Sequence, residues 1–123
     1  MPDYVYHNVN PKQHKIEDCV CRAIKTATGL GYNTVINLLN WTSTIYKCDK
    51  LNVDCYSHLL DEVFRYRCYH CYEGETVTYI AKCFPESKLI IRIEGHLTCS
   101  MNGSISDIWD CSKETVDKFW IVE

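Results

Sequence analysis

The stretch HLTCSMNGSISDIW, residues 96–109, carries the strongest fold signal in the chain. Two segments of alternating polarity flank Asn102-Gly103. Asn-Gly between two such segments is typical of a β-hairpin closed by a two-residue type I′ turn. The stretch therefore predicts two antiparallel strands, 96–101 and 104–109, joined at this turn.

The register of the hairpin decides which side chains share a face of the sheet. A two-residue turn pairs Met101 with Ser104, and directly paired residues project to the same side. Continuing the pairing predicts one shared face for four residues: His96, Thr98, Asp107 and Trp109. Asp107 is then the diagonal neighbour of His96, within reach of a carboxylate–imidazole hydrogen bond. Asp110 projects to the opposite face.

The segments before the hairpin have helical patterns. Apolar residues at helical spacing predict a helix that begins after Asp18 and ends before Gly29, and a second helix that is capped by Asn33. Two further helices are expected over 54–67 and 76–84, separated by a turn region at 68–75. Residues 88–94 and 118–123 read as strands. Helices followed by an antiparallel meander indicate an α+β chain, with N-terminal helices packed on a C-terminal antiparallel sheet.

Length and composition predict a single domain spanning residues 1–123. The chain has 123 residues, of which 46% are hydrophobic and 24% charged, as in a globular protein. A net charge of −3 with a pI near 5.9 argues against a nucleic-acid binder that uses a broad basic surface. No apolar run is long enough to span a bilayer, and no apolar signal segment precedes the domain. We therefore expect a cytoplasmic protein with no membrane partner.

Nine cysteines are present, and an odd number cannot all pair within one chain. Without a secretion signal, the expected state is reduced thiols in a cytosol. One of these thiols, Cys19, is predicted to open the first helix, directly after the proposed cap Asp18. The partial positive charge and unpaired N–H groups of a helix start favour the reactive thiolate form. Cys21 is expected to point elsewhere on the helix, so Cys19 is the candidate nucleophile.

A cysteine that opens a helix, a histidine on a later strand and an aspartate on the next strand follow the order of a papain-like site. The stretches EDCVCRAIKTATG and GHLTCSMNGSISDIWD resemble those of small papain-like cysteine peptidases of bacteria and phages. The resemblance covers the first two helices and residues 88–111, but not residues 41–87. It implies a papain-like fold and a Cys19–His96–Asp107 triad.

The resemblance also implies roles for two further residues. Gln13, six residues before the nucleophile, is the expected side-chain donor to the oxyanion, beside the backbone N–H of Cys19. Trp109 is the expected aromatic shield of the site. The implied reaction is attack of the Cys19 thiolate on an amide or isopeptide carbonyl of a protein or peptide, with His96 carrying the proton and no cofactor.

Zinc is the main chemical alternative. Cys68 and Cys71 form a C-x-x-C pair with His70 between them, and this spacing occurs in zinc sites. A matched second pair is absent from the sequence. The alternative site would therefore need ligands from distant segments.

Two further functions are compatible with the same fold. An acyltransferase uses the same triad with an acceptor other than water. A phage-type accessory protein binds a host component without catalysis, using tyrosine and tryptophan as contact residues.

Overall fold

The computed structural model describes residues 4–8 and 19–122. Helical segments cover α1 (Cys19–Thr28), α2 (Tyr32–Tyr46), α3 (Val53–His58), the π-helical turn η1 (Leu59–Val63) and α4 (Val77–Cys83). The strands are β1 (Tyr4–Tyr6), β2 (Arg67–His70), β3 (Lys88–Ile93), β4 (His96–Met101), β5 (Ser104–Asp107) and β6 (Val116–Val122). None of the helices in these ranges is long and apolar enough to cross a membrane.

A single sheet with the strand order β1-β5-β4-β3-β6-β2 organises the fold. The strand β1 runs parallel to β5, and the other neighbours are antiparallel. The α+β class is confirmed. The expectation of a purely antiparallel, C-terminal sheet is wrong, because the edge strands β1 and β2 both precede the meander in sequence.

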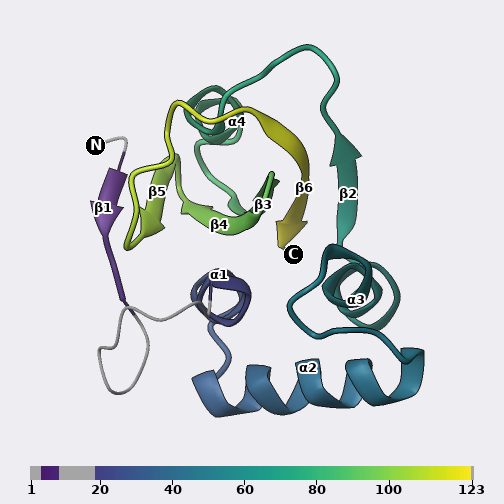
Figure 1. The fold of residues 1–123 in the computed structure, drawn as a ribbon. Helices are drawn as coiled ribbons and strands as arrows, with labels where there is room; N and C mark the ends of the chain where they lie inside the picture. The colour runs from purple at the N-terminus through teal and green to yellow at the C-terminus, as the bar shows by residue number, and fades with distance from the viewer. Residues whose placement is uncertain (1–3, 9–18, 123) are drawn as a thin grey trace.

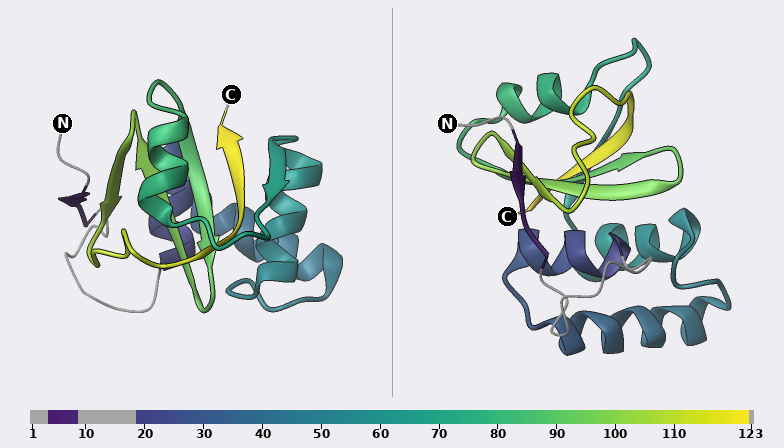
Figure 2. Two further views of the ribbon diagram at one scale, coloured as in Figure 1. Left: turned by 90° about the horizontal axis from the view of Figure 1, so that it is seen from above. Right: turned by 60° about the vertical axis from the view of Figure 1, so that its left-hand side comes forward.

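Helices cover both faces of the sheet, with α4 on one side and α1 on the other, and α2 lies beyond α1 (Figures 1 and 2). Successive side chains of β3 point to opposite faces of the sheet and so contribute to two hydrophobic cores. Ile90 packs with α1, α2 and Trp120, whereas Leu89 and Ile91 pack on the α4 side with Phe119. Because both faces are covered, the central strand is apolar at consecutive positions rather than at every second one.

The hairpin is built as its sequence predicts. Asn102 has φ 53° and Gly103 has φ 86°, the positive values that a type I′ turn requires at both central residues. Met101 pairs with Ser104, which confirms the predicted register at the turn. The second strand ends at Asp107 rather than at residue 109. The chain leaves the sheet there, and Asp107 stands at the end of a strand.

Replacing Gly103 by alanine is expected to lower the free energy of unfolding by about 1–2 kcal/mol, because L-residues are strained at positive φ. An added Cβ would meet Pro85 only at ordinary contact, 3.6 Å from its Cα atom, so the cost is conformational. Urea denaturation measures it. Gly31 has φ −65°, which alanine adopts freely, and Gly31→Ala is the matched control. Equal losses in the two variants would contradict the turn assignment.

The first helix follows its predicted pattern. Its predicted apolar stripe is buried: Val20, Ala23, Ile24 and Ala27. The helix ends at Thr28 and is followed by Gly29 with φ 77°. The expected cap Asp18 lies outside the described residues.

Three predictions between the first helix and the meander are wrong. The second helix begins at Tyr32 and its cap is Gly31, so Asn33 lies inside the helix and does not cap it. The expected helix over 54–67 is divided into α3 and η1 and ends at Val63, and Arg65 then takes a positive φ of 58°. The expected turn region at 68–75 instead starts inside β2, which pairs with β6. An edge strand that is largely exposed has no apolar alternation, so its sequence shows little strand signal.

The last strand is longer than predicted. It begins at Val116 rather than at residue 118. Its central position between β3 and β2 gives it partners on both sides along much of its length.

Candidate functional site

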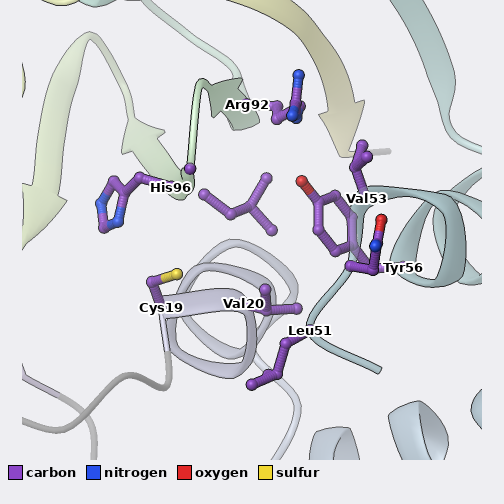
Figure 3. A pocket seen from close by; sticks show the side chains of 10 residues that line it. Cys19, Val20, Leu51, Val53, Tyr56, Arg92 and His96 are labelled. Atoms are coloured by element: carbon purple, nitrogen blue, oxygen red, sulfur yellow. The ribbon is translucent and has the colours of Figure 1, made fainter. Parts of the chain in front are cut away.

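The structure places Cys19 at the start of α1, where it lines the same groove as His96 (Figure 3). Burial raises the pKa of the thiol. Hydrogen bonds from the His96 side chain and the Leu97 backbone N–H more than offset this, so the pKa lies below its ordinary value. The surroundings of the sulfur therefore favour its thiolate form.

His96 and Asp107 meet across the hairpin. His96 begins β4 and Asp107 ends β5, and His96 Nε2 lies 2.6 Å from Asp107 Oδ2. Both side chains are shielded from solvent, with 12% and 4% of their side-chain areas exposed. The predicted carboxylate–imidazole contact is therefore present. Because Nε2 is hydrogen-bonded to Asp107, Nδ1 is the ring nitrogen that can exchange a proton with Cys19.

The carboxylate of Asp107 is fixed on several sides. The Ile108 backbone N–H donates to Oδ1 at 2.7 Å, and Nη2 of Arg22 lies 3.9 Å from the same oxygen. Burial raises the pKa of Asp107, but the hydrogen bond from His96 and its charge outweigh it, so the pKa lies below its ordinary value. Asp107 is therefore held as a carboxylate.

The main chain at Asp107 is anchored by the N-terminal strand. Its carbonyl oxygen accepts hydrogen bonds from the Tyr4 hydroxyl at 2.9 Å and from the His7 backbone N–H at 2.9 Å. These contacts hold the end of β5, from which the carboxylate projects toward the imidazole.

The imidazole of His96 strongly prefers its protonated form. Burial lowers its pKa, but hydrogen bonds to Asp107, Cys111 and Cys19 outweigh burial and place the pKa well above 6.5. A lowered thiol pKa beside a raised imidazole pKa describes a thiolate–imidazolium pair. Such a pair supplies a nucleophile and a proton donor at neutral pH.

Trp109 lies against the imidazole. Its ring centroid is 4.9 Å from that of His96 and the two planes are inclined by 70°. The side chain is 45% exposed, so one part covers the histidine and another faces solvent. Trp109 is outside β5, and it reaches the ring from the segment after the strand rather than as a ladder partner. Its placement fits the expected shielding role.

A groove runs from the thiol–imidazole pair between α1, the start of α3 and the β3–β4 turn (Figure 3). Its cavity volume is about 250 Å³. Apolar side chains of Val20, Leu51 and Val53 line it, and Arg92 lies at the end away from Cys19. The thiol and the imidazole therefore open onto a groove with both polar and apolar lining that can receive part of a substrate.

Arg22 belongs to the site although the sequence pattern did not identify it. It is buried in the apolar stripe of α1, one turn after Cys19, and approaches Asp107. A signal was present, because a charged residue on the buried side of a helix requires a partner. Cys111 was also missed. It is buried next to His96 and Asp107, and no spacing pattern marks it.

The structure gives different outcomes for Gln13 and Cys21. Gln13 lies outside the described residues. Cys21 is buried and its thiol donates to the Tyr32 carbonyl oxygen at 3.6 Å, while burial raises its pKa to about 11. Cys21 therefore points away from His96, as the helical spacing predicts.

The C-x-x-C pair does not converge on one site. Cys68 packs against the core on the α1 side of the sheet, and Cys71 packs against the core on the α4 side. Within residues 4–8 and 19–122, neither belongs to a group of three potential metal ligands. The two sulfurs and His70 thus provide no assembled tetrahedral zinc site.

No protein-family model, curated protein or solved structure matches the chain. The function is therefore inferred from the geometry of the chain itself.

Proposed function

We propose that the protein is a thiol-dependent hydrolase of amide or isopeptide bonds with a papain-like arrangement of Cys19, His96 and Asp107. The observation that carries the proposal is the assembly of three groups: Cys19 and His96 line one groove, and His96 Nε2 lies 2.6 Å from Asp107 Oδ2. Its components come from a helix start and two paired strands. Convergence of nucleophile, base and orienting acid from distant segments is typical of a catalytic triad.

In the first half of the reaction, the Cys19 thiolate attacks the carbonyl carbon and a sulfur–carbon bond forms. Negative charge on the carbonyl oxygen is stabilised by backbone N–H groups at the start of α1. The imidazolium of His96 gives its proton to the leaving nitrogen as the carbon–nitrogen bond breaks. The products are a free amine and a thioester on Cys19.

In the second half, neutral His96 takes a proton from water, which attacks the thioester carbon. The sulfur–carbon bond breaks, and the carboxylic acid and thiolate are released. Asp107 keeps the imidazole oriented and stabilises its charged form in both halves.

The groove indicates where the substrate lies. Its lining combines the apolar side chains of Val20, Leu51 and Val53 with the charged side chain of Arg92, and it suits a protein or peptide segment that carries both apolar and polar groups. All nine cysteines are free thiols, which supports a reducing compartment such as the cytoplasm of a bacterium or of a phage-infected cell.

The same three residues also support acyl transfer to an amine. Only the acceptor differs, because an amine in place of water would attack the thioester. Product analysis by mass spectrometry, with and without added primary amine, separates hydrolysis from transfer.

A binding role without catalysis is the second candidate. Trp41 and Ile45 are one turn apart on α2 and are 48% and 56% exposed. Large exposed apolar side chains on one helix face are typical contact residues for a protein partner. An unreactive Cys19 would favour this function.

The test of the hydrolase is selective alkylation of Cys19. At mildly acidic pH, a thiol-directed electrophile is expected to label Cys19 first, because its pKa is lowered. Burial instead raises the pKa of Cys21, Cys68 and Cys99. Peptide mapping by mass spectrometry identifies the labelled residue.

His96→Ala should remove the preference for Cys19, because the thiolate loses its imidazolium partner. His58→Ala is the control, since His58 is exposed and bonded to Glu62. Uniform labelling of the exposed thiols, or preference for Cys19 that survives in His96→Ala, would overturn the proposed triad.

A further inference from the structure

A second thiol contacts the catalytic histidine. Cys111 is 1% exposed and lies next to His96 and Asp107. One ligand atom each from His96, Asp107 and Cys111 lies within 4.8 Å of the other two. The proposed hydrolysis uses the nitrogen and the carboxylate but has no step for this sulfur.

The three ligand atoms match the preferences of Zn²⁺. Zinc binds imidazole nitrogen, carboxylate oxygen and thiolate sulfur, often with water in the fourth position. Metal–ligand distances of about 2.0–2.3 Å place the ligand atoms about 3.2–3.7 Å apart in a tetrahedral site. The 2.6 Å contact between His96 Nε2 and Asp107 Oδ2 would open by roughly 0.6–1 Å to admit the ion.

The charges around the cluster determine how strongly it can bind. The Asp107 carboxylate and a Cys111 thiolate together neutralise a divalent ion, as a shielded site requires. The positive charge of Arg22 disfavours cation binding, because its guanidinium lies 3.9 Å from the Oδ1 atom of Asp107. The balance favours reversible occupancy over a permanently bound structural metal.

We propose that His96, Asp107 and Cys111 form a reversible site for one Zn²⁺ ion, or for Cd²⁺, and that the ion switches off Cys19. The switching part rests on the proposed hydrolase function. A ring that holds the ion through Nε2 keeps its remaining proton on Nδ1. It therefore cannot take up a second proton, and Cys19 loses both its general base and the imidazolium that stabilises its thiolate.

The first test uses the full chain, freed of metal with a chelator and then loaded with one equivalent of Zn²⁺. X-ray absorption at the zinc edge should show one sulfur at about 2.3 Å and nitrogen or oxygen ligands at about 2.0–2.2 Å. A shell with two or more sulfurs, or no stoichiometric binding, would overturn the site. This measurement needs no variant and so does not depend on the folding of a mutant.

Three variants then identify the sulfur. Cys111→Ser is expected to weaken zinc binding at least about tenfold, since even outer-shell losses reduce metal affinity 10- to 100-fold. Cys19→Ser and the double variant Cys68→Ser/Cys71→Ser should bind as the parent does. Retained affinity in a folded Cys111→Ser protein, or lost affinity in Cys19→Ser, would refute the assignment. Cys111→Ala serves as the second variant if serine disrupts the core, and circular dichroism verifies both folds.

Alkylation of Cys19 separates the metal site from the hydrolase. In the parent, Zn²⁺ should suppress Cys19 labelling and a chelator should restore it. If the protein binds zinc through one sulfur but metal-free protein shows no preferential labelling of Cys19, the hydrolase proposal is refuted and the metal site is retained. If Cys19 is labelled preferentially and Zn²⁺ does not change the labelling, the proposed inhibition by zinc is refuted and the hydrolase proposal is retained.

Discussion

An Asp107→Asn variant is expected to hydrolyse its substrate about 100- to 10,000-fold more slowly than the parent, with its fold intact. The carboxylate accepts a hydrogen bond from His96 Nε2 at 2.6 Å and stabilises the imidazolium. An amide in its place carries no charge and can turn a second N–H donor toward the ring, which disfavours the required protonation state. The measurement is kcat/KM on a peptide or isopeptide substrate selected from a library, with circular dichroism as the check on folding.

Asp110→Asn is the matched control for this substitution. Asp110 lies three residues further on, is exposed, and accepts a hydrogen bond from the Ser112 backbone N–H at 3.1 Å. Its activity should stay within about twofold of the parent, because surface substitutions change free energies by about 0.5 kcal/mol or less. Parental activity in Asp107→Asn, with Cys19→Ala inactive, would exclude the carboxylate from the mechanism.

Trp120→Ala is expected to lower the free energy of unfolding by about 3–5 kcal/mol. The Trp120 side chain is fully buried between the sheet and the helices on the α1 side. Its Nε1–H donates to Asp61 Oδ1 at 2.6 Å, and its ring meets Tyr56 edge-on with centroids 6.1 Å apart. Truncation therefore leaves a cavity and removes the donor from a carboxylate, a large loss against a typical total of about 5–15 kcal/mol. Urea denaturation measures the change.

Two further substitutions separate the contributions at this position. Trp120→Phe keeps an aromatic ring but removes the N–H, and it should cost about 1–3 kcal/mol. Trp41→Ala removes the same side chain from an exposed site on α2 and should cost about 0.5 kcal/mol or less. Equal losses for Trp120→Ala and Trp41→Ala would contradict the burial of Trp120.

Local chemistry explains why part of the site could be predicted. Asn102-Gly103 fixes the turn, the turn fixes the register, and the register brings Asp107 to His96 within one hairpin. The apolar spacing of α1 likewise places Cys19 at a helix start. Each of these inferences depends on residues close together in sequence. The approach of Cys19 to His96 joins positions far apart, and only the resemblance to papain-like enzymes suggested it.

The elements that were missed depend on tertiary contacts. The strand β2 is an exposed edge whose pairing with β6 outweighs its weak local signal. Cys111 lies next to His96 because of the path of the chain after Asp107, and no periodic pattern encodes that path. In a sequence with nine cysteines, composition alone could not distinguish this thiol from those that only fill the core.

The short strand β1 has a practical consequence for anyone who prepares the protein. It pairs with β5, the strand that carries Asp107, so that β5 is an internal strand of the sheet rather than an edge strand. Proteolytic loss or displacement of residues 4–6 during affinity-tag removal would expose the backbone amide and carbonyl groups of β5. A bared strand readily recruits another chain and promotes self-association. Preparations that lack residues 4–6 should therefore form oligomers, and the Asp107 carboxylate should be displaced from His96.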